Sequence, residues 1–154
     1  MLEIAIVLCL VVLNGVFALS ELAIVSARRS RFKALAAEGR NGANRALALA
    51  SDPGRFLSTV QIGITAVGLI AGAYSGATLT GDFANYLADK GVPYSAASWL
   101  AYVLIFAFIT YLSLIIGELV PKNLALRNAE SIACTMAPLM TTLSRIAAPA
   151  VWLL

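Results

Sequence analysis

Two glutamates, Glu21 and Glu118, lie at the ends of apolar stretches that carry almost no other charge. An ionised side chain at membrane depth costs free energy, and it usually contacts an ion, a proton or an opposite charge. We therefore expect these two carboxylates to lie close to a cation.

Glu118 is preceded by Gly117 and followed by Pro121 and Lys122. Proline has no amide hydrogen, and its ring clashes with the carbonyl four residues earlier, which here is that of Gly117. A carbonyl freed in this way inside a membrane must be satisfied by another group, and transporters use such broken helices to coordinate cations. A carboxylate beside a free carbonyl, opposite hydroxyl-bearing helices, is an all-oxygen set that suits Mg²⁺, Ca²⁺ or Na⁺.

A simpler interpretation is charge neutralisation at the inner end of the helices. Glu118 is one helical turn from Lys122, and Glu21 is about two turns from Arg28 and Arg29, so each carboxylate has a basic partner within reach. The residue pattern alone leaves both interpretations open.

In the first apolar stretch, Asn14 and Glu21 are seven residues apart and share one face of a helix, with Gly15 beside them. Ser20 points about 100° away from Glu21 on a regular helix. Only a local π-type bulge would bring the two side chains together. Of the two glutamates, Glu118 is the better ligand candidate, and Glu21 is expected to support it.

The second apolar stretch has one small and polar face, on which residues recur at steps of three and four. Gly68, Gly72 and Gly76 also form two overlapping Gly-x-x-x-Gly units, which allow neighbouring helices to approach closely. This face predicts either part of an ion path or helix packing alone. Its members are Gln61, Thr65, Gly68, Gly72 and Ser75.

The chain has no histidine, which excludes imidazole metal sites and nucleophiles activated by histidine. A carboxylate with serines offers no other activated nucleophile of the usual kinds, so we do not expect an enzyme. Cys9 and Cys134 have no spacing typical of a metal or redox pair, and both are predicted to pack in the core.

Composition predicts an all-α membrane protein, since 60% of the residues are hydrophobic, 12% are charged and the mean hydropathy is +0.87. Residues 1–154 are expected to form one domain with membrane spans at about 2–27, 56–81 and 94–120, each long enough for a hydrocarbon core of about 30 Å. Helices beside the membrane are expected at about 30–50 and 123–154. Because Pro138, Arg145 and Pro149 interrupt the last apolar segment, it could span or lie along the membrane.

Basic residues are concentrated between the first two spans, which predicts that this connection is cytoplasmic. The amino terminus would then be outside a cell (inner) membrane that the chain crosses several times, and the carboxyl end would be cytoplasmic. The same rule explains the net charge of +3, so no nucleic acid partner is expected, and residues 30–50 predict a helix on the lipid surface. The basic residues are Arg28, Arg29, Arg31, Lys33, Arg40, Arg45 and Arg55.

Three motifs carry a family resemblance. They are NGVFALSELA at 14–23, FLSTVQIGIT at 56–65 and GELVPK at 117–122. In this order and spacing they resemble the transmembrane domain of the CorC/CNNM (cyclin M) family of magnesium transport proteins, over essentially the whole chain.

The resemblance implies a homodimer in which each subunit has three transmembrane helices and a belt of juxtamembrane helices. Family members continue into cytoplasmic CBS domains, which we do not expect within this chain. The implied function is Mg²⁺ export, driven by Na⁺ through alternating access, with a dehydrated cation bound by hydroxyl, carboxylate and carbonyl oxygens. A membrane-embedded Mg²⁺ sensor, or a dimerisation module acting through partner domains, is the alternative.

Carried over to this sequence, the resemblance implies four metal ligands and five supporting residues. The ligands are Ser20, Ser75, Gly117 and Glu118. The supporting residues are Asn14, Glu21, Gln61, Pro121 and Lys122.

Overall fold

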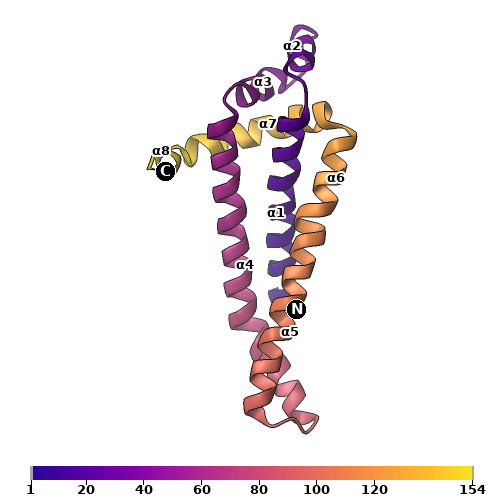
Figure 1. Ribbon diagram of the computed structural model, residues 1–154, viewed down its shortest axis with the longest axis vertical. Coiled ribbons are helices and arrows are strands. Elements are labelled where there is room, and N and C mark those ends of the chain that lie inside the picture. Colours follow the sequence, from indigo (N-terminus) through magenta and orange to yellow (C-terminus); the bar gives the residue numbers. More distant parts are fainter. Residues whose placement is uncertain (1, 154) are drawn as a thin grey trace.

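A computed structural model describes residues 2–153, and every regular element in that range is a helix (Figure 1). Three long rods dominate: α1 (Leu2–Ser26), α4 (Pro53–Asp89), and a third that begins as α5 (Tyr94–Leu114). The third rod continues through a π-helical turn, η1 (Ile115–Leu119), into α6 (Val120–Arg127). The prediction of an all-α fold is confirmed.

The three rods are long and apolar enough to cross a membrane. Their number agrees with the three predicted spans, although α4 continues to Asp89 and the third rod to Arg127. At 1.5 Å per residue, α4 is about 55 Å long and exceeds the hydrocarbon core. Many large apolar side chains on these rods are exposed, among them Leu69, Trp99 and Phe108. Such a surface suits lipid, so the chain is a membrane protein.

The third rod changes its neighbour along its length. α5 packs mainly on α4, whereas η1 and α6 pack on α1. α1 also packs on α4, where a Cβ on Gly63 would lie 2.7 Å from the Phe17 ring. α4 and α5 continue beyond the amino-terminal end of α1 and are joined at a turn around Gly91, whose φ of +95° favours glycine (Figure 1).

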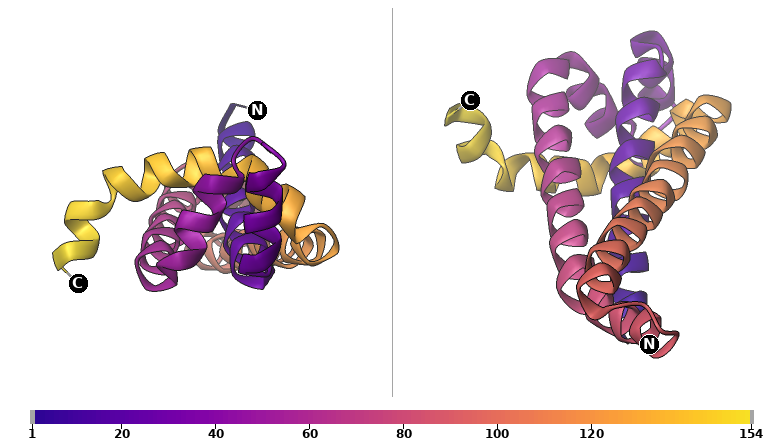
Figure 2. Two further views of the ribbon diagram at one scale, coloured as in Figure 1. Left: turned by 90° about the horizontal axis from the view of Figure 1, so that it is seen from above. Right: turned by 60° about the horizontal axis from the view of Figure 1, so that its bottom comes forward.

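Four short helices gather at the opposite end of the rods: α2 (Arg29–Ala37), α3 (Ala43–Ser51), α7 (Ala129–Ile146) and α8 (Ala148–Leu153). α7 contacts α1, α3 and α4 and runs across their ends (Figures 1 and 2). Its buried side includes Ala133, Cys134 and Met140, which join Phe32 and Phe56 in one apolar core. The last apolar segment therefore lies across the rods instead of forming a fourth one.

The single helix predicted at 30–50 is divided in two by a turn between α2 and α3. Gly39 and Gly42 both have positive φ, +75° and +82°, which glycine adopts without strain. Gly42 also packs so tightly on α7 that a Cβ there would overlap the carbonyl oxygen of Cys134.

The prediction that both cysteines are core residues is right for Cys134, which is buried, and wrong for Cys9, which is exposed. The thiol of Cys9 lies on an outward face of α1, where an apolar environment is supplied by lipid or by another subunit instead of the subunit's own core.

Candidate functional site

The π-helical turn η1 contains both Gly117 and Glu118 and ends at Leu119, two residues before Pro121. In this turn the amide of Val120 donates to the carbonyl of Ile115, five residues back. The turn is thus one residue wider than an α-helical turn. It lies where Pro121, which has no amide hydrogen, cannot donate to the carbonyl of Gly117 as another residue would in a regular helix. π turns of this kind are frequent at functional sites.

The carbonyl of Gly117 is satisfied by a side chain from another helix. Asn14 Nδ2, on α1, donates a hydrogen bond to Gly117 O at 3.2 Å. The position of Pro121 predicted that this carbonyl would need a partner outside its own helix, and Asn14 is that partner. A carbonyl oxygen has two lone pairs, so Gly117 O retains capacity for a second ligand.

Two glycines allow the backbones of α1 and η1 to approach. A Cβ on Gly15 would lie 3.0 Å from both Ile116 O and Pro121 Cγ. A Cβ on Gly117 would lie 3.2 Å from Val11 O. Contacts this short are tighter than ordinary van der Waals packing, so the hydrogen bond between the two helices depends on glycine at both positions.

Asn14 also holds an oxygen that no protein group satisfies. Its Oδ1 atom is buried and has no hydrogen-bond partner in the described part of the chain. Leaving such an atom unpaired costs about 1–3 kcal/mol, so it indicates a site that takes a further donor or cation. The family resemblance implied only a supporting role for Asn14, whereas the geometry makes its amide oxygen a direct ligand candidate.

Glu118 follows Gly117 in the chain, and its side chain is 46% exposed. Its Oε1 accepts a hydrogen bond from Lys122 Nζ at 2.6 Å, one turn further along. The neutralisation considered for Glu118 is therefore present in this structure. Glu21 is half-buried and forms no ion pair among residues 2–153, so the proposed pairing with Arg28 or Arg29 is not found.

Ser20 and Glu21 point in different directions, because α1 is a regular α-helix from Leu2 to Ser26. The bulge considered for this helix is absent there and occurs in the third rod instead. Ser20 is fully buried, and its hydroxyl donates to Val16 O at 2.7 Å. It lies six residues, about 9 Å, beyond Asn14 along the helix axis.

Ser75 is buried, and its hydroxyl donates to Gly72 O at 3.0 Å. Its neighbour Gly76 faces Tyr102 on α5, where a Cβ would lie 3.9 Å from the ring. Tyr102 is fifteen residues before Gly117, about 20 Å along the third rod. A single subunit therefore does not bring Ser75 to the level of Gly117, and its assignment as a ligand of that site stays a prediction.

The polar face of α4 is open within the subunit. Gln61, Thr65 and Gly68 are exposed, and no atom of the described residues lies within 4 Å of a Cβ built on Gly68 or Gly72. Gln61 is thus not part of the cluster around Gly117. The face is free for a second copy of the chain or for movement of the helix.

Any metal bound by residues 2–153 would depend largely on neutral oxygens, since no group of three or more His, Cys, Asp or Glu side chains there could hold one. The oxygens at or next to the π turn are Asn14 Oδ1, Gly117 O and the Glu118 carboxylate. This set fits a hard cation such as Mg²⁺ or Na⁺ better than a soft one.

Sequence reasoning did not foresee a π turn in the third rod, although the spacing from Gly117 to Pro121 was the signal for it. Nor did it foresee that Asn14 would reach Gly117, because a contact across 103 residues depends on how two helices are packed. Gly15, noted as a close-packing residue, was the nearest indication.

Comparison with known proteins finds relatives over nearly the whole chain. The family model for the Cyclin M transmembrane N-terminal domain matches residues 4–154. The UPF0053 protein sll0260 of Synechocystis sp. is 49% identical over 153 residues, which cover 99% of this chain and 34% of that protein. The UPF0053 protein YhdP of Bacillus subtilis is 32% identical over 94% of this chain and 33% of its own length.

A more distant relative is the polyamine export protein of Escherichia coli K12, which is 28% identical over 97% of this chain and 33% of its own length. The chain thus spans about a third of the length of the curated relatives it matches. With the family match over nearly every residue, this chain belongs to the cyclin M (CNNM) transmembrane domain family.

Proposed function

We propose that this domain exports Mg²⁺ across the cell membrane, with Na⁺ as the coupled ion, by alternating access. One observation carries the proposal: the buried Oδ1 of Asn14, unpaired in the described part of the chain, belongs to the amide that donates to the carbonyl of Gly117, the residue directly before Glu118. These are oxygen ligands at membrane depth, and they suit a hard cation that has lost part of its water.

Each group has a role in this mechanism. Glu118 supplies the negative charge, while Asn14 and Gly117 supply neutral oxygens, and Ser20 offers a hydroxyl about 9 Å further along α1. Mg²⁺ demands six oxygens in octahedral geometry and sheds water reluctantly, so bound water completes the shell. Ser75 serves a separate position on the path, nearer the turn between α4 and α5.

Lys122 acts as a tethered substitute for the transported ion. Its ammonium group occupies Glu118 at 2.6 Å in this structure, which keeps the carboxylate neutralised when no metal is bound. Entry of Mg²⁺ displaces the ammonium group, and release of Mg²⁺ restores the ion pair. An ionised carboxylate at membrane depth needs a positive partner, and this exchange gives Glu118 one in both states.

The same pair supports a second candidate, export of organic polycations. Relatives in Escherichia coli and Salmonella typhimurium are named polyamine export protein. The Lys122 ammonium on Glu118 is chemically equivalent to one amine of such a substrate. A linear polycation would use Glu118 for one ammonium group and the neutral oxygens of Asn14 and Gly117 as hydrogen-bond acceptors.

The assembly we propose is a homodimer in lipid, with the open face of α4 turned toward the second copy, and with cytoplasmic CBS domains in the longer protein. The loop containing Arg40 would be cytoplasmic. The domain carries out transport without covalent chemistry, so no enzymatic activity is proposed. A sensor that binds Mg²⁺ without moving it is the rival that transport measurements separate.

The test is flux into liposomes that contain the full-length protein, with a Mg²⁺-sensitive dye on one side and a Na⁺ gradient across the membrane. We expect Mg²⁺ movement that depends on Na⁺, and its loss in Glu118→Gln. Glu130→Gln is the matched control, because Glu130 lies on α7 outside the rods, where it meets Arg31 at 3.9 Å. Radiolabelled spermidine in parallel vesicles tests the second candidate.

Movement of spermidine alone would replace the first proposal by the second. Binding of Mg²⁺ that requires Glu118 without any flux would favour the sensor. Wild-type flux in Glu118→Gln would remove the site from the transport path altogether.

A further inference from the structure

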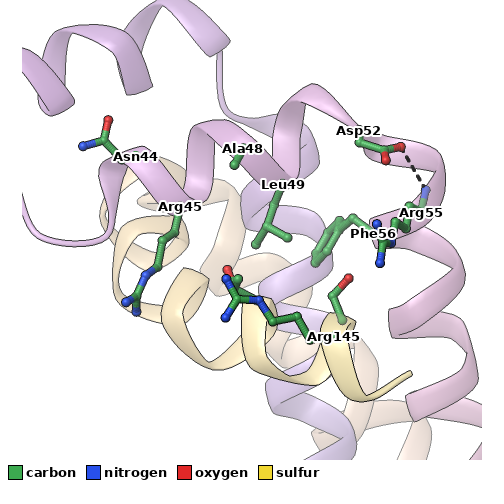
Figure 3. Close-up of a pocket in the computed structure, with 10 residues that line it drawn as sticks. Asn44, Arg45, Ala48, Leu49, Asp52, Arg55, Phe56 and Arg145 are labelled. Atoms are coloured by element: carbon green, nitrogen blue, oxygen red, sulfur yellow. Dashed lines mark hydrogen bonds between the residues drawn. The ribbon is translucent and has the colours of Figure 1, made fainter. Parts of the chain in front are cut away.

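A separate, strongly basic hollow lies where the first turn of α4 meets α3 and α7 (Figure 3). It has a volume of about 390 Å³, and three of its ten lining residues are arginines, one from each helix. In Figure 3, Arg145 of α7 extends toward Arg45 of α3, and Arg55 lies near Asp52 on the other side of Phe56. Three positive side chains that line one hollow repel one another, and a bound anion offsets this repulsion.

The arginines have no acidic partner of their own. None of Arg45, Arg55 and Arg145 forms an ion pair among residues 2–153. The one carboxylate in the hollow, that of Asp52, accepts a hydrogen bond from the backbone amide of Arg55 at 3.3 Å and so caps α4. Three positive charges against one negative charge leave the hollow positive, which favours an anion such as the phosphate of a phosphodiester.

Hydroxyl groups add to the floor of the hollow. Ser144 is buried, and its hydroxyl lies 3.4 Å from Thr59 Oγ1. Because Thr59 donates its single hydroxyl hydrogen to Arg55 O at 2.9 Å, Ser144 is the donor in this contact. Thr141 also lines the hollow, although its hydroxyl donates to Ala137 O at 2.7 Å. The hollow therefore combines guanidinium groups, which bind phosphate oxygens, with hydroxyl groups that are hydrogen-bonded within the protein.

The position of the hollow relative to the membrane indicates the source of the phosphate. Residues 56–81 carry no charge, so Arg55 stands at the boundary between the apolar part of α4 and the short helices. Lipid phosphates lie at this boundary, and basic pockets beside membrane helices bind anionic head groups there.

An apolar neighbour strengthens this assignment. A second hollow of about 630 Å³ shares Arg55 and is lined by Ser58, Ala148, Pro149, Val151 and Trp152. Trp152 is 87% exposed on α8, where tryptophan commonly marks the membrane interface. A phosphate site that opens beside an apolar hollow suits an amphiphile and offers no advantage to a free phosphate ion.

We propose that this basic hollow binds the phosphate of one anionic phospholipid, whose acyl chain lies in the adjacent hollow lined by α8. The lipid bridges α3, α4 and α7, so it fixes the short helices against the ends of the rods. Arg45 and Arg145 hold the phosphate from two sides.

The test uses the full-length protein in a neutral detergent, with phosphatidylglycerol, phosphatidylcholine or inorganic phosphate added separately. We expect phosphatidylglycerol to raise the melting temperature and to remain bound in native mass spectra, and the other two to do neither. In Arg45→Gln/Arg145→Gln, phosphatidylglycerol should bind about 30-fold more weakly, since each basic residue near the surface contributes about fivefold.

Lys33→Gln/Arg127→Gln is the matched control, because it removes two exposed positive charges outside the hollow. Wild-type binding in this control and weak binding in the arginine pair would support the proposal. Equal weakening in both variants would mean that only total charge matters, and an equal effect of inorganic phosphate would assign the hollow to a soluble anion. Either result overturns the lipid site.

Discussion

Glycines have opposite effects in two regions of this molecule. Where α1 meets η1, Gly15 and Gly117 are enclosed, and a Cβ on either would come within 3.2 Å of a backbone oxygen of the other helix. On α4, Gly68 and Gly72 face space that the described residues of the subunit leave open. The same residue type thus permits close approach inside the subunit in one region and leaves a face unfilled in the other.

The difference has a physical consequence. The enclosed region joins two helices through a polar contact, from Asn14 to the carbonyl of Gly117, and the buried Oδ1 remains beside it. The open face has no such contact, and leaving it open does not lower the stability of the subunit. Substitutions in the first region should therefore disturb the fold and the site together, whereas those in the second should affect only assembly or movement.

The largest effect is expected for Gly117→Leu. Overpacking at a backbone contact should destabilise the domain by about 3 kcal/mol or prevent folding, because α1 and η1 must separate. Gly68→Leu is the control, since it meets open space and should change stability by less than about 0.5 kcal/mol. Chemical unfolding in detergent, followed by circular dichroism, measures both. Similar losses of unfolding free energy in the two variants would show that enclosed and open glycines do not differ.

The next effect concerns the polar contact. Asn14→Leu removes the donor to Gly117 and should cost about 2 kcal/mol, because a buried carbonyl is left unpaired. Asn123→Leu is a matched control, since Asn123 Nδ2 also donates to a backbone carbonyl, that of Leu119 at 3.1 Å, but at an exposed position. Unfolding free energies should separate the two variants, and equal values would show that burial does not decide the cost.

A smaller effect on the subunit is expected on the open face. Gly72→Leu should change the unfolding free energy of the subunit by less than about 0.5 kcal/mol, yet weaken the proposed homodimer through lost close packing. Gly81→Leu is the control, because Gly81 is also open but lies on the opposite face of α4. Cross-linking in nanodiscs reports the dimer, and an unaffected dimer in Gly72→Leu would place the interface elsewhere.

The smallest effect is expected at Cys134, whose backbone packs against a third enclosed glycine, Gly42. Burial raises the pKa of the Cys134 thiol above its ordinary value of 9.0, with Glu130 acting in the same direction and Arg40 against it. The folded chain therefore holds this proton more tightly than the unfolded chain. Its contribution to stability is fully present below pH 9.0 and is lost as the pH rises through the folded pKa.

The unfolding free energy of wild type should accordingly fall more steeply above pH 9.0 than that of Cys134→Ala. Cys9→Ala, altered on an exposed face of α1, should retain the wild-type slope. Parallel curves for all three proteins would show that the Cys134 environment does not resist ionisation.

Much of the fold was predictable, because charge and hydropathy report directly on membrane depth. The charge-free runs located all three rods, and Pro121 indicated that Gly117 would need a partner outside its helix. The division between α2 and α3 was missed, since it depends on positive φ at Gly39 and Gly42. The separation of Ser75 from Gly117 was missed as well, because helical periodicity places residues on a face but does not say how far two helices slide along each other.

By itself, the sequence determined the membrane class, the helical fold and the family, since these follow from local composition and from motifs in a given order. Only the tertiary structure decided that the widened turn lies in the third rod, that Asn14 satisfies Gly117, and that Glu118 pairs with Lys122. The reason is that a hydrogen bond between helices depends on their relative depth and rotation. Packing at Gly15 and Gly117 sets both quantities, and no pattern within a single helix contains them.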